Sequence, residues 1–223
     1  MRYVFLIVIG GAGTAVLLWL GFWQLDRLEW KEAVLHEIEA RISDAPKGLP
    51  AQPDPETDRY LPVSASGMLG EDEIHVLVSA KVFGPGYRVI RAFETGGRRV
   101  MVDLGVIPTS EKARARGAQG PLTVTGNLHW PDEIDAFTPP PDGAANIWFA
   151  RDVPALAARL GTEPILIVAQ SSAPPVAGII PFPVDTSGIP NDHLGYAVTW
   201  FGMAAVWLFM TGLFVYRGRR HVV

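Results

Sequence analysis

Histidine is the residue type in this chain best suited to ligating a metal, and the chain contains five. Four of them lie where a surface or structural role is expected, at His36, His75, His129 and His221. His193 differs, because it immediately precedes a long uncharged stretch suited to a membrane. An ionisable group at a membrane boundary marks a candidate functional site, which we place at His193.

The residues that follow His193 give this site its chemical character. On a helix, His193 shares a face with Tyr196, Ala197, Trp200 and Ala204. A neutral imidazole beside small residues and aromatic rings could ligate and hold a flat, apolar cofactor such as haem. His193 is then the candidate iron ligand, with Tyr196 and Trp200 as candidate cofactor-binding residues. An interfacial histidine within an aromatic belt explains the same residues without any cofactor.

Two uncharged stretches, residues 3–25 and 194–216, are each long enough to cross a bilayer as a helix. We predict two transmembrane helices, the first an uncleaved anchor, because a signal peptide would have a shorter apolar region and a clear cleavage site. The small residues from Gly10 to Ala15 predict a close approach of the two helices as a hairpin. Ordinary membrane glycines would give the same pattern.

Charge predicts the orientation of these helices. Arg217, Arg219 and Arg220 follow the second stretch, whereas Asp185 and Asp192 precede it. Because Lys and Arg usually mark the cytoplasmic side, both termini are expected in the cytoplasm, with residues 217–223 as a basic cytoplasmic tail. Residues 26–192 are then expected outside.

The residues between the two spans predict a helical stalk and one β-rich domain. Helical periodicity continues through residues 26–45, and Pro46 ends it. Residues 46–192 form the domain and its lead-in to the second span, with one helix at 152–161. Strands are predicted at 63–67, 74–78, 87–93, 100–106, 122–128 and 165–169. The fold class is therefore two transmembrane α-helices flanking a β-rich α+β domain, whose antiparallel sheet could close like a barrel.

Composition excludes several classes of function. The chain has 223 residues, a formal net charge of -4 and no cysteine, so disulfides, thiolate metal sites and cysteine nucleophiles are excluded. The acidic balance disfavours nucleic acid as a partner. The sequence contains no Gly-x-Ser-x-Gly elbow, no His-Glu-x-x-His and no phosphate-binding glycine loop. We therefore expect a protein that is not an enzyme.

Motifs at both membrane boundaries and in the middle of the chain resemble one known family. They are Leu20-Gly21-Phe22-Trp23-Gln24-Leu25-x-Arg27-x-x-Trp30-Lys31, Asn191-x-His193-Leu194-x-Tyr196-Ala197-x-Thr199-Trp200-Phe201, Gly126-x-Leu128, Phe137-x-Pro139 and Asn146-x-Trp148-Phe149-x-x-Asp152. Together with the two spans and the domain between them, they resemble the surfeit locus protein one family of cytochrome c oxidase assembly factors. The stretch Val102–Pro108 departs from the pattern usual in that family.

The resemblance implies a factor that binds haem a and assists its insertion into oxidase subunit I, beside haem a synthase. It also implies that His193 is the candidate haem ligand and Trp200 a pocket residue. Because no transit peptide precedes the first span, the expected location is a bacterial inner membrane, with the domain in the periplasm.

Two other functions remain open from the sequence. A cofactor-free scaffold that stabilises an oxidase assembly intermediate would need neither haem nor His193. A copper-delivery factor would need soft ligands, and a chain with no cysteine and five methionines argues against it.

Overall fold

The computed structural model describes residues 2–80, 84–114, 116 and 120–220. The chain forms two compact units. One, the helix pair, comprises residues 1–37 and 186–223, and the other, the barrel domain, comprises residues 38–185. The predicted tail at 217–223 lies partly outside the described residues, because the description ends at Arg220.

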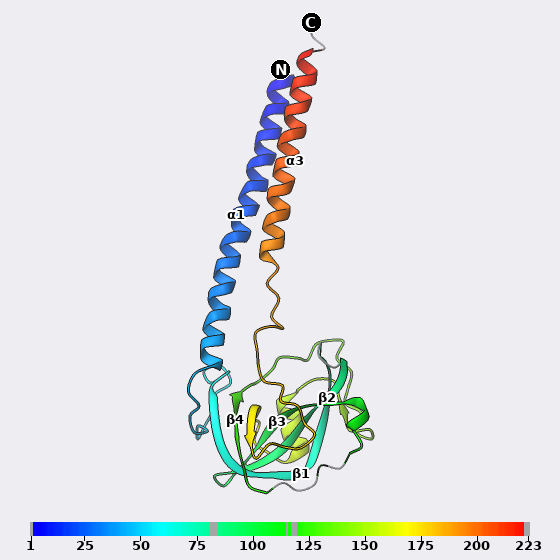
Figure 1. The fold of residues 1–223 in the computed structure, drawn as a ribbon. Coiled ribbons are helices and arrows are strands. Elements are labelled where there is room, and N and C mark those ends of the chain that lie inside the picture. Colours follow the sequence, from blue (N-terminus) through cyan, green and yellow to red (C-terminus); the bar gives the residue numbers. More distant parts are fainter. Residues whose placement is uncertain (1, 81–83, 115, 117–119, 221–223) are drawn as a thin grey trace. The chain divides into compact units, whose positions relative to one another are not determined.

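The helix pair is built from α1 (Arg2–Ile42) and α3 (His193–Arg220), which run side by side with both chain ends at the same end of the pair (Figure 1). Both helices are long and apolar enough to cross a membrane. Only 11% of the most apolar window of α1 and 6% of that of α3 is buried inside the protein. A core helix would bury most of such a window, so this exposure is consistent with a membrane protein.

Glycines allow the two helices to approach closely. A Cβ on Gly10 would lie 2.1 Å from Thr211 Cγ2, and one on Gly13 would lie 2.5 Å from Trp207 Nε1. The Trp207 indole also donates a hydrogen bond to the Gly10 carbonyl oxygen at 3.0 Å. A Cβ on Gly11 would meet nothing within 4 Å. The predicted hairpin packing at the small-residue patch is therefore confirmed.

The contacts of the helix pair follow a heptad-like seam. In α1, the buried and half-buried positions include 10, 14, 17, 21, 24 and 28, which alternate spacings of four and three. In α3, Ala197 and Ala204 are buried at 1% and 3% exposure, seven residues apart. This spacing is typical of helices that pack along a narrow stripe. The seam positions Gln24 and His193, as described below.

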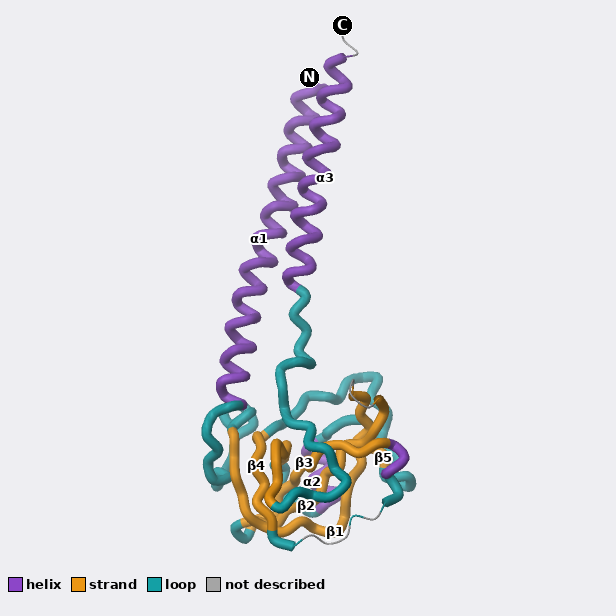
Figure 2. Tube along the Cα trace, viewed as in Figure 1, coloured by secondary structure: helices purple, strands orange, loops and turns teal. Residues whose placement is uncertain are grey.

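The barrel domain closes a sheet of five strands, shown in orange in Figure 2. Its strands are β1 (Pro62–Ala80), β2 (Gly84–Thr95), β3 (Arg98–Pro108), β4 (Leu122–Leu128) and β6 (Leu166–Ala173). They pair in the order β1-β2-β3-β6-β4 and return to β1. The short β5 (Ile147–Trp148) adds to β1 in parallel. The predicted β-rich α+β domain with a barrel-like sheet is confirmed, and its pairings are antiparallel apart from β1–β5 and β3–β6.

One long strand replaces two of the predicted ones. The segments 63–67 and 74–78 belong to the single strand β1, whose first part pairs with β4 and whose second part pairs with β2. An irregularity between Leu69 and Glu73 lies near the change of partner. A bulge bends a strand and increases its twist. The bend allows the two parts of β1 to pair with different strands, β4 and β2, and so to close the barrel. The polar run Glu71–Glu73, which separates the two segments in the sequence, coincides with this bend.

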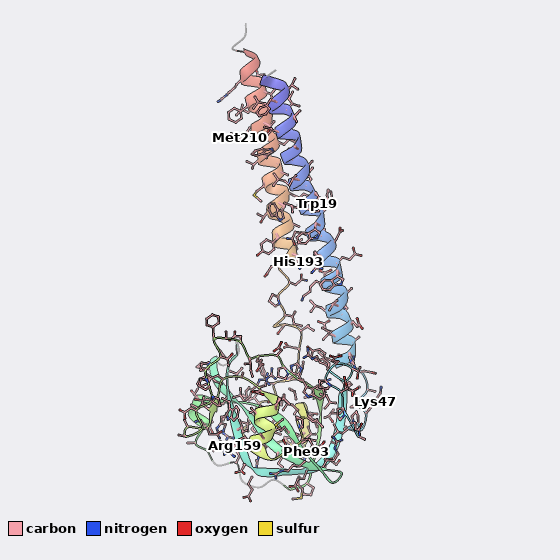
Figure 3. The ribbon with its side chains drawn as sticks, turned by 180° about the vertical axis from the view of Figure 1, so that it is seen from behind. Trp19, Lys47, Phe93, Arg159, His193 and Met210 are labelled. Carbon is pink, nitrogen blue, oxygen red and sulfur yellow. The ribbon has the colours of Figure 1, made fainter. Side chains whose placement is uncertain are left out.

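Two apolar cores hold the barrel domain together. The first fills the barrel with alternate side chains of the strands, including Phe93, which is labelled in Figure 3. The second lies between the sheet and helix α2 (Val153–Leu160), which buries Leu156 and Leu160. Asp152 caps this helix by accepting a hydrogen bond from the Ala155 N–H, and Gly161 ends it with a φ of 63°. The helix predicted at 152–161 is confirmed. A 3-10 turn, η1 (Thr109–Glu111), follows β3.

Candidate functional site

His193 is the first residue of α3 and lies half-buried in the seam of the helix pair (Figure 3). Its Nδ1 lies 2.7 Å from Oε1 of Gln24 in α1. An amide oxygen can only accept a hydrogen bond, so Nδ1 carries the hydrogen and donates it. In the neutral form of the ring, this arrangement places the lone pair on Nε2. Metal-ligating histidines are usually held in this way, with the other ring nitrogen donating to an oxygen.

Gln24 is the partner that fixes this imidazole. Gln24 lies in a part of α1 that contains no charged residue, and it is only 8% exposed. A buried amide without a hydrogen bond would cost about 1–3 kcal/mol. The contact with His193 therefore satisfies Gln24 and at the same time sets the tautomer and orientation of the ring. One turn of α1 earlier, the seam is apolar.

An aromatic contact lies beside this polar pair. The rings of Phe22 and Phe201 meet edge to face, with their centroids 5.3 Å apart. Gly21 makes room for Phe201, because a Cβ there would lie 2.6 Å from the Phe201 ring. This packing holds the first turns of α3 against α1 and so maintains the distance between Gln24 and His193.

The three predicted site residues lie in the first turns of α3 and differ in exposure. Trp200 is half-buried and, on helical spacing, shares a face with His193 and the buried Ala197. Tyr196 is 56% exposed. His193 and Trp200 are therefore brought to one face, and Tyr196 lies at its side.

An apolar groove lies farther along α3, and its lining does not include His193, Tyr196 or Trp200. It is lined by Leu17 of α1 and by α3 residues, among them Thr199, Met203, Trp207 and Met210, and has a volume of about 750 Å³. Figure 3 shows Met210 farther along the helix from His193.

The histidines of the barrel domain have different surroundings. His129 stacks on Tyr60 with a centroid distance of 5.3 Å. The pKa of His129 is lowered to about 4, mostly by burial and in addition by the nearby guanidinium groups of Arg151 and Arg59. This imidazole is therefore neutral at pH 7. His75 is 5% exposed, and its Nε2 lies 2.9 Å from Glu73 Oε1. Both rings are packed among structural groups.

The barrel domain also contains a buried ionic network. Asp103 of β3 is completely buried, 2.6 Å from Arg88 Nη1 and 3.7 Å from Arg151 Nη1. Arg151 also pairs with Glu133. Burial alone would raise the pKa of Glu133, but the hydrogen bonds and charge of Arg151 lower it below its ordinary value. Within the described residues, no group of three or more His, Asp or Glu side chains could hold a metal ion.

The sequence as a whole matches one family. A sequence model of the SURF1 family matches residues 12–205, a range that contains Gln24, His193 and Trp200. The chain belongs to the SURF1 family. This is a family of cytochrome c oxidase assembly factors. The resemblance given by the boundary motifs is confirmed.

Individual relatives match over most of the chain. Surfeit locus protein 1 of Homo sapiens is 28% identical over 213 residues, which cover 83% of this chain and 69% of the human protein. The Rattus norvegicus protein of the same name is 26% identical over 208 residues, covering 83% and 68%. A SURF1-like protein of Monosiga brevicollis is 28% identical over 212 residues, covering 86% and 80%.

Sequence reasoning missed Gln24 as a site residue, although it lies within the first boundary motif. The available signal was chemical, because Gln24 is the one amide side chain in the uncharged stretch of residues 3–25. A polar side chain inside a span usually faces another helix. Its partner could not be read from the sequence, because the two residues are 169 positions apart.

Proposed function

We propose that this protein serves cytochrome c oxidase assembly by binding haem a at His193 and passing it to oxidase subunit I, working beside haem a synthase. The observation that carries the proposal is the hydrogen bond between His193 Nδ1 and Gln24 Oε1 at 2.7 Å. It leaves Nε2 as a free, oriented nitrogen. Haem iron takes an imidazole nitrogen of this kind.

The residues around His193 fit such a cargo. Haem a offers an iron that accepts an imidazole and a large apolar surface. Trp200 would pack against the macrocycle, with the exposed Tyr196 beside it, and the groove along α3 would receive the hydrocarbon tail. Nothing in this arrangement requires a second histidine within the helix pair.

A site of this design also suits release. A chaperone has to give up its cargo, and affinity that rests on one ligand bond plus apolar contact can be exchanged at a membrane surface. The Gln24 hydrogen bond would tune the basicity of the ring, because the partner of the second nitrogen affects how strongly an imidazole binds metal. We infer that Gln24 is a positioning residue for His193.

The test is an optical spectrum of the full-length protein, purified in detergent after expression with haem a synthase. We expect bound haem a in the wild-type protein, a lower haem content and a shifted Soret band in His193→Ala, and a smaller change in Trp200→Phe. His36→Ala, which alters an exposed histidine of α1, is the matched control and should leave the spectrum unchanged.

Two outcomes would contradict the proposal. A wild-type protein without haem would favour the cofactor-free scaffold. A His193→Ala protein with normal haem content and spectrum, together with a His129→Ala protein that loses them, would place the cofactor in the barrel domain.

We further propose that the protein resides in a bacterial inner membrane with both termini in the cytoplasm and the barrel domain in the periplasm. The arginines at the end of α3 support this orientation. Since the chain has no cysteine, single cysteines report position without background labelling. A cysteine between Thr138 and Gly143 should react with a membrane-impermeant thiol reagent in intact spheroplasts, and one beside Arg219 should not. The reverse pattern would contradict the orientation.

A further inference from the structure

An exposed apolar patch lies on the barrel domain, in the segment that links β4 to α2. Phe137 is 90% exposed, Ile134 is 53% exposed and Phe149 is 38% exposed. Ile134 and Phe149 line one groove together with Pro139 and Trp148, and Phe137 lies on the same loop, between Ile134 and Pro139 in the chain. Contiguous apolar surface of this kind usually marks an interaction site, whereas scattered single residues do not.

The loop that carries Phe137 is held in place by its own hydrogen bonds. Asp135 Oδ1 accepts from the Phe137 N–H at 2.8 Å and from Thr138 Oγ1 at 2.9 Å. At the other end of the segment, the Arg151 N–H donates to Glu133 Oε2 at 2.8 Å. An apolar side chain presented on an ordered loop loses little freedom on binding, which favours a docking role.

The surroundings of the patch are acidic. Residues 131–150 contain four carboxylates, Asp132, Glu133, Asp135 and Asp142, and no Lys or Arg. From outside the segment, Arg151 pairs with Glu133, and Lys112 donates to the Ala145 carbonyl oxygen. Asp152 lines the groove itself, and the remaining three carboxylates lie in the same segment as its lining residues, so the rim of the groove carries a negative charge. Such a rim is repelled by anionic lipid headgroups and attracts a basic protein segment.

We propose that this patch docks a segment of a partner protein that presents one large apolar side chain with Lys or Arg beside it. The groove has a volume of about 250 Å³, which is smaller than typical cofactor pockets and suits a side chain. Ile134 and Phe149, which line the groove, would contact the inserted side chain, and Phe137 and Asp132 on the same loop would contact its neighbours. This inference is independent of haem binding at His193, because every residue in it belongs to the barrel domain.

The test is site-specific photocrosslinking of the full-length protein in cells, with p-benzoylphenylalanine in place of Phe137. We expect a protein adduct whose crosslinked peptide, identified by mass spectrometry, contains an apolar residue next to Lys or Arg. Adding Asp132→Lys should lower the adduct yield about tenfold, because the rim then repels the basic segment that it would otherwise attract. Asp72→Lys, an exposed carboxylate on β1, is the matched control and should leave the yield unchanged.

Three results would overturn the proposal. Adducts mainly to lipid would assign the patch to the membrane surface, and adducts to a second copy of this chain would assign it to self-association. The same adducts from p-benzoylphenylalanine at Met68, which is 52% exposed on β1, would show unspecific contact. Phe137→Ser should retain the wild-type stability, since a side chain so exposed contributes little to folding.

Discussion

The barrel domain and the helix pair differ in what their buried polar groups contact. In the barrel domain, buried charges face one another, as Asp103 faces Arg88 and Arg151. Arg91, which is completely buried, donates to the Gly70 carbonyl oxygen. In the described part of the helix pair, the buried polar side chain is Gln24, and it contacts a histidine that keeps a free nitrogen.

This difference separates structural from functional polar groups. A closed ionic network uses its donors and acceptors internally, so it specifies and stabilises a fold and has little left for a ligand. A single hydrogen bond to one nitrogen of an imidazole leaves the other nitrogen oriented and available. The comparison therefore predicts large stability losses from the barrel network and small ones from the polar contacts of the helix pair.

The largest effect is expected for Asp103→Asn in the barrel domain. The substitution keeps the shape of the side chain but removes the charge between two buried guanidinium groups. Breaking a buried pair in this way costs about 3–5 kcal/mol in the free energy of unfolding. Urea unfolding of the full-length protein in detergent would measure it. Glu163→Gln is the control, because its pair with Arg98 is partly exposed and contributes about 0–1 kcal/mol. Equal losses in the two variants would refute the structural role of the network.

Much of the fold could be predicted because its signals are local. The spans follow from uncharged length, α2 follows from Asp152 and Gly161, and the strands follow from alternation. The continuity of β1 could not be predicted, because the polar residues Glu71–Glu73 imitate a turn and only the closed barrel requires one bent strand there. The position of β6 between β3 and β4 is likewise a property of the closed sheet.

The candidate site was predictable to the same extent. His193 was found because an ionisable residue at the start of an apolar helix is unusual, and Trp200 follows from helical spacing. The Gln24 contact depends on how two distant helices pack, which one sequence does not contain. The ionic network around Asp103 was missed for the same reason, since its members lie far apart in the chain.

The second prediction concerns His129 and pH. The pKa of His129 is about 4 in the folded protein, against an ordinary value of 6.5. Between pH 4 and 6.5 the unfolded chain binds more protons than the folded protein. The stability that depends on a neutral His129 is therefore fully present above pH 6.5 and falls as the pH drops towards 4. This difference in pKa corresponds to about 3 kcal/mol in the free energy of unfolding. His129→Gln should flatten the fall in unfolding free energy between pH 7 and 5, whereas His36→Gln should retain it. A retained fall in His129→Gln would show that other groups cause it.

The third prediction compares neighbouring glycines in the helix pair. Gly10→Ala places a Cβ against Thr211, so the helices must separate locally, at a cost of about 1–3 kcal/mol. Gly11→Ala meets open space and should have no such effect. Disulfide formation between cysteines introduced at positions 14 and 207 would report the packing. Equal crosslinking in Gly10→Ala and Gly11→Ala would contradict the close contact between the two helices at Gly10.

The smallest effect is expected for Trp207→Phe, which removes the hydrogen bond to the Gly10 carbonyl oxygen but keeps an aromatic ring. Thr14 Oγ1 also donates to this oxygen at 2.8 Å, so the acceptor remains satisfied. Hydrogen bonds between membrane helices contribute about 0.6 kcal/mol on average, which is several-fold less than the Asp103 network. Urea unfolding of the full-length protein in detergent, the measurement used for Asp103→Asn, should therefore show a nearly wild-type free energy of unfolding. A loss as large as that of Asp103→Asn would mean that the helix pair depends on its polar contacts as strongly as the barrel does, and the distinction between the two regions would fail.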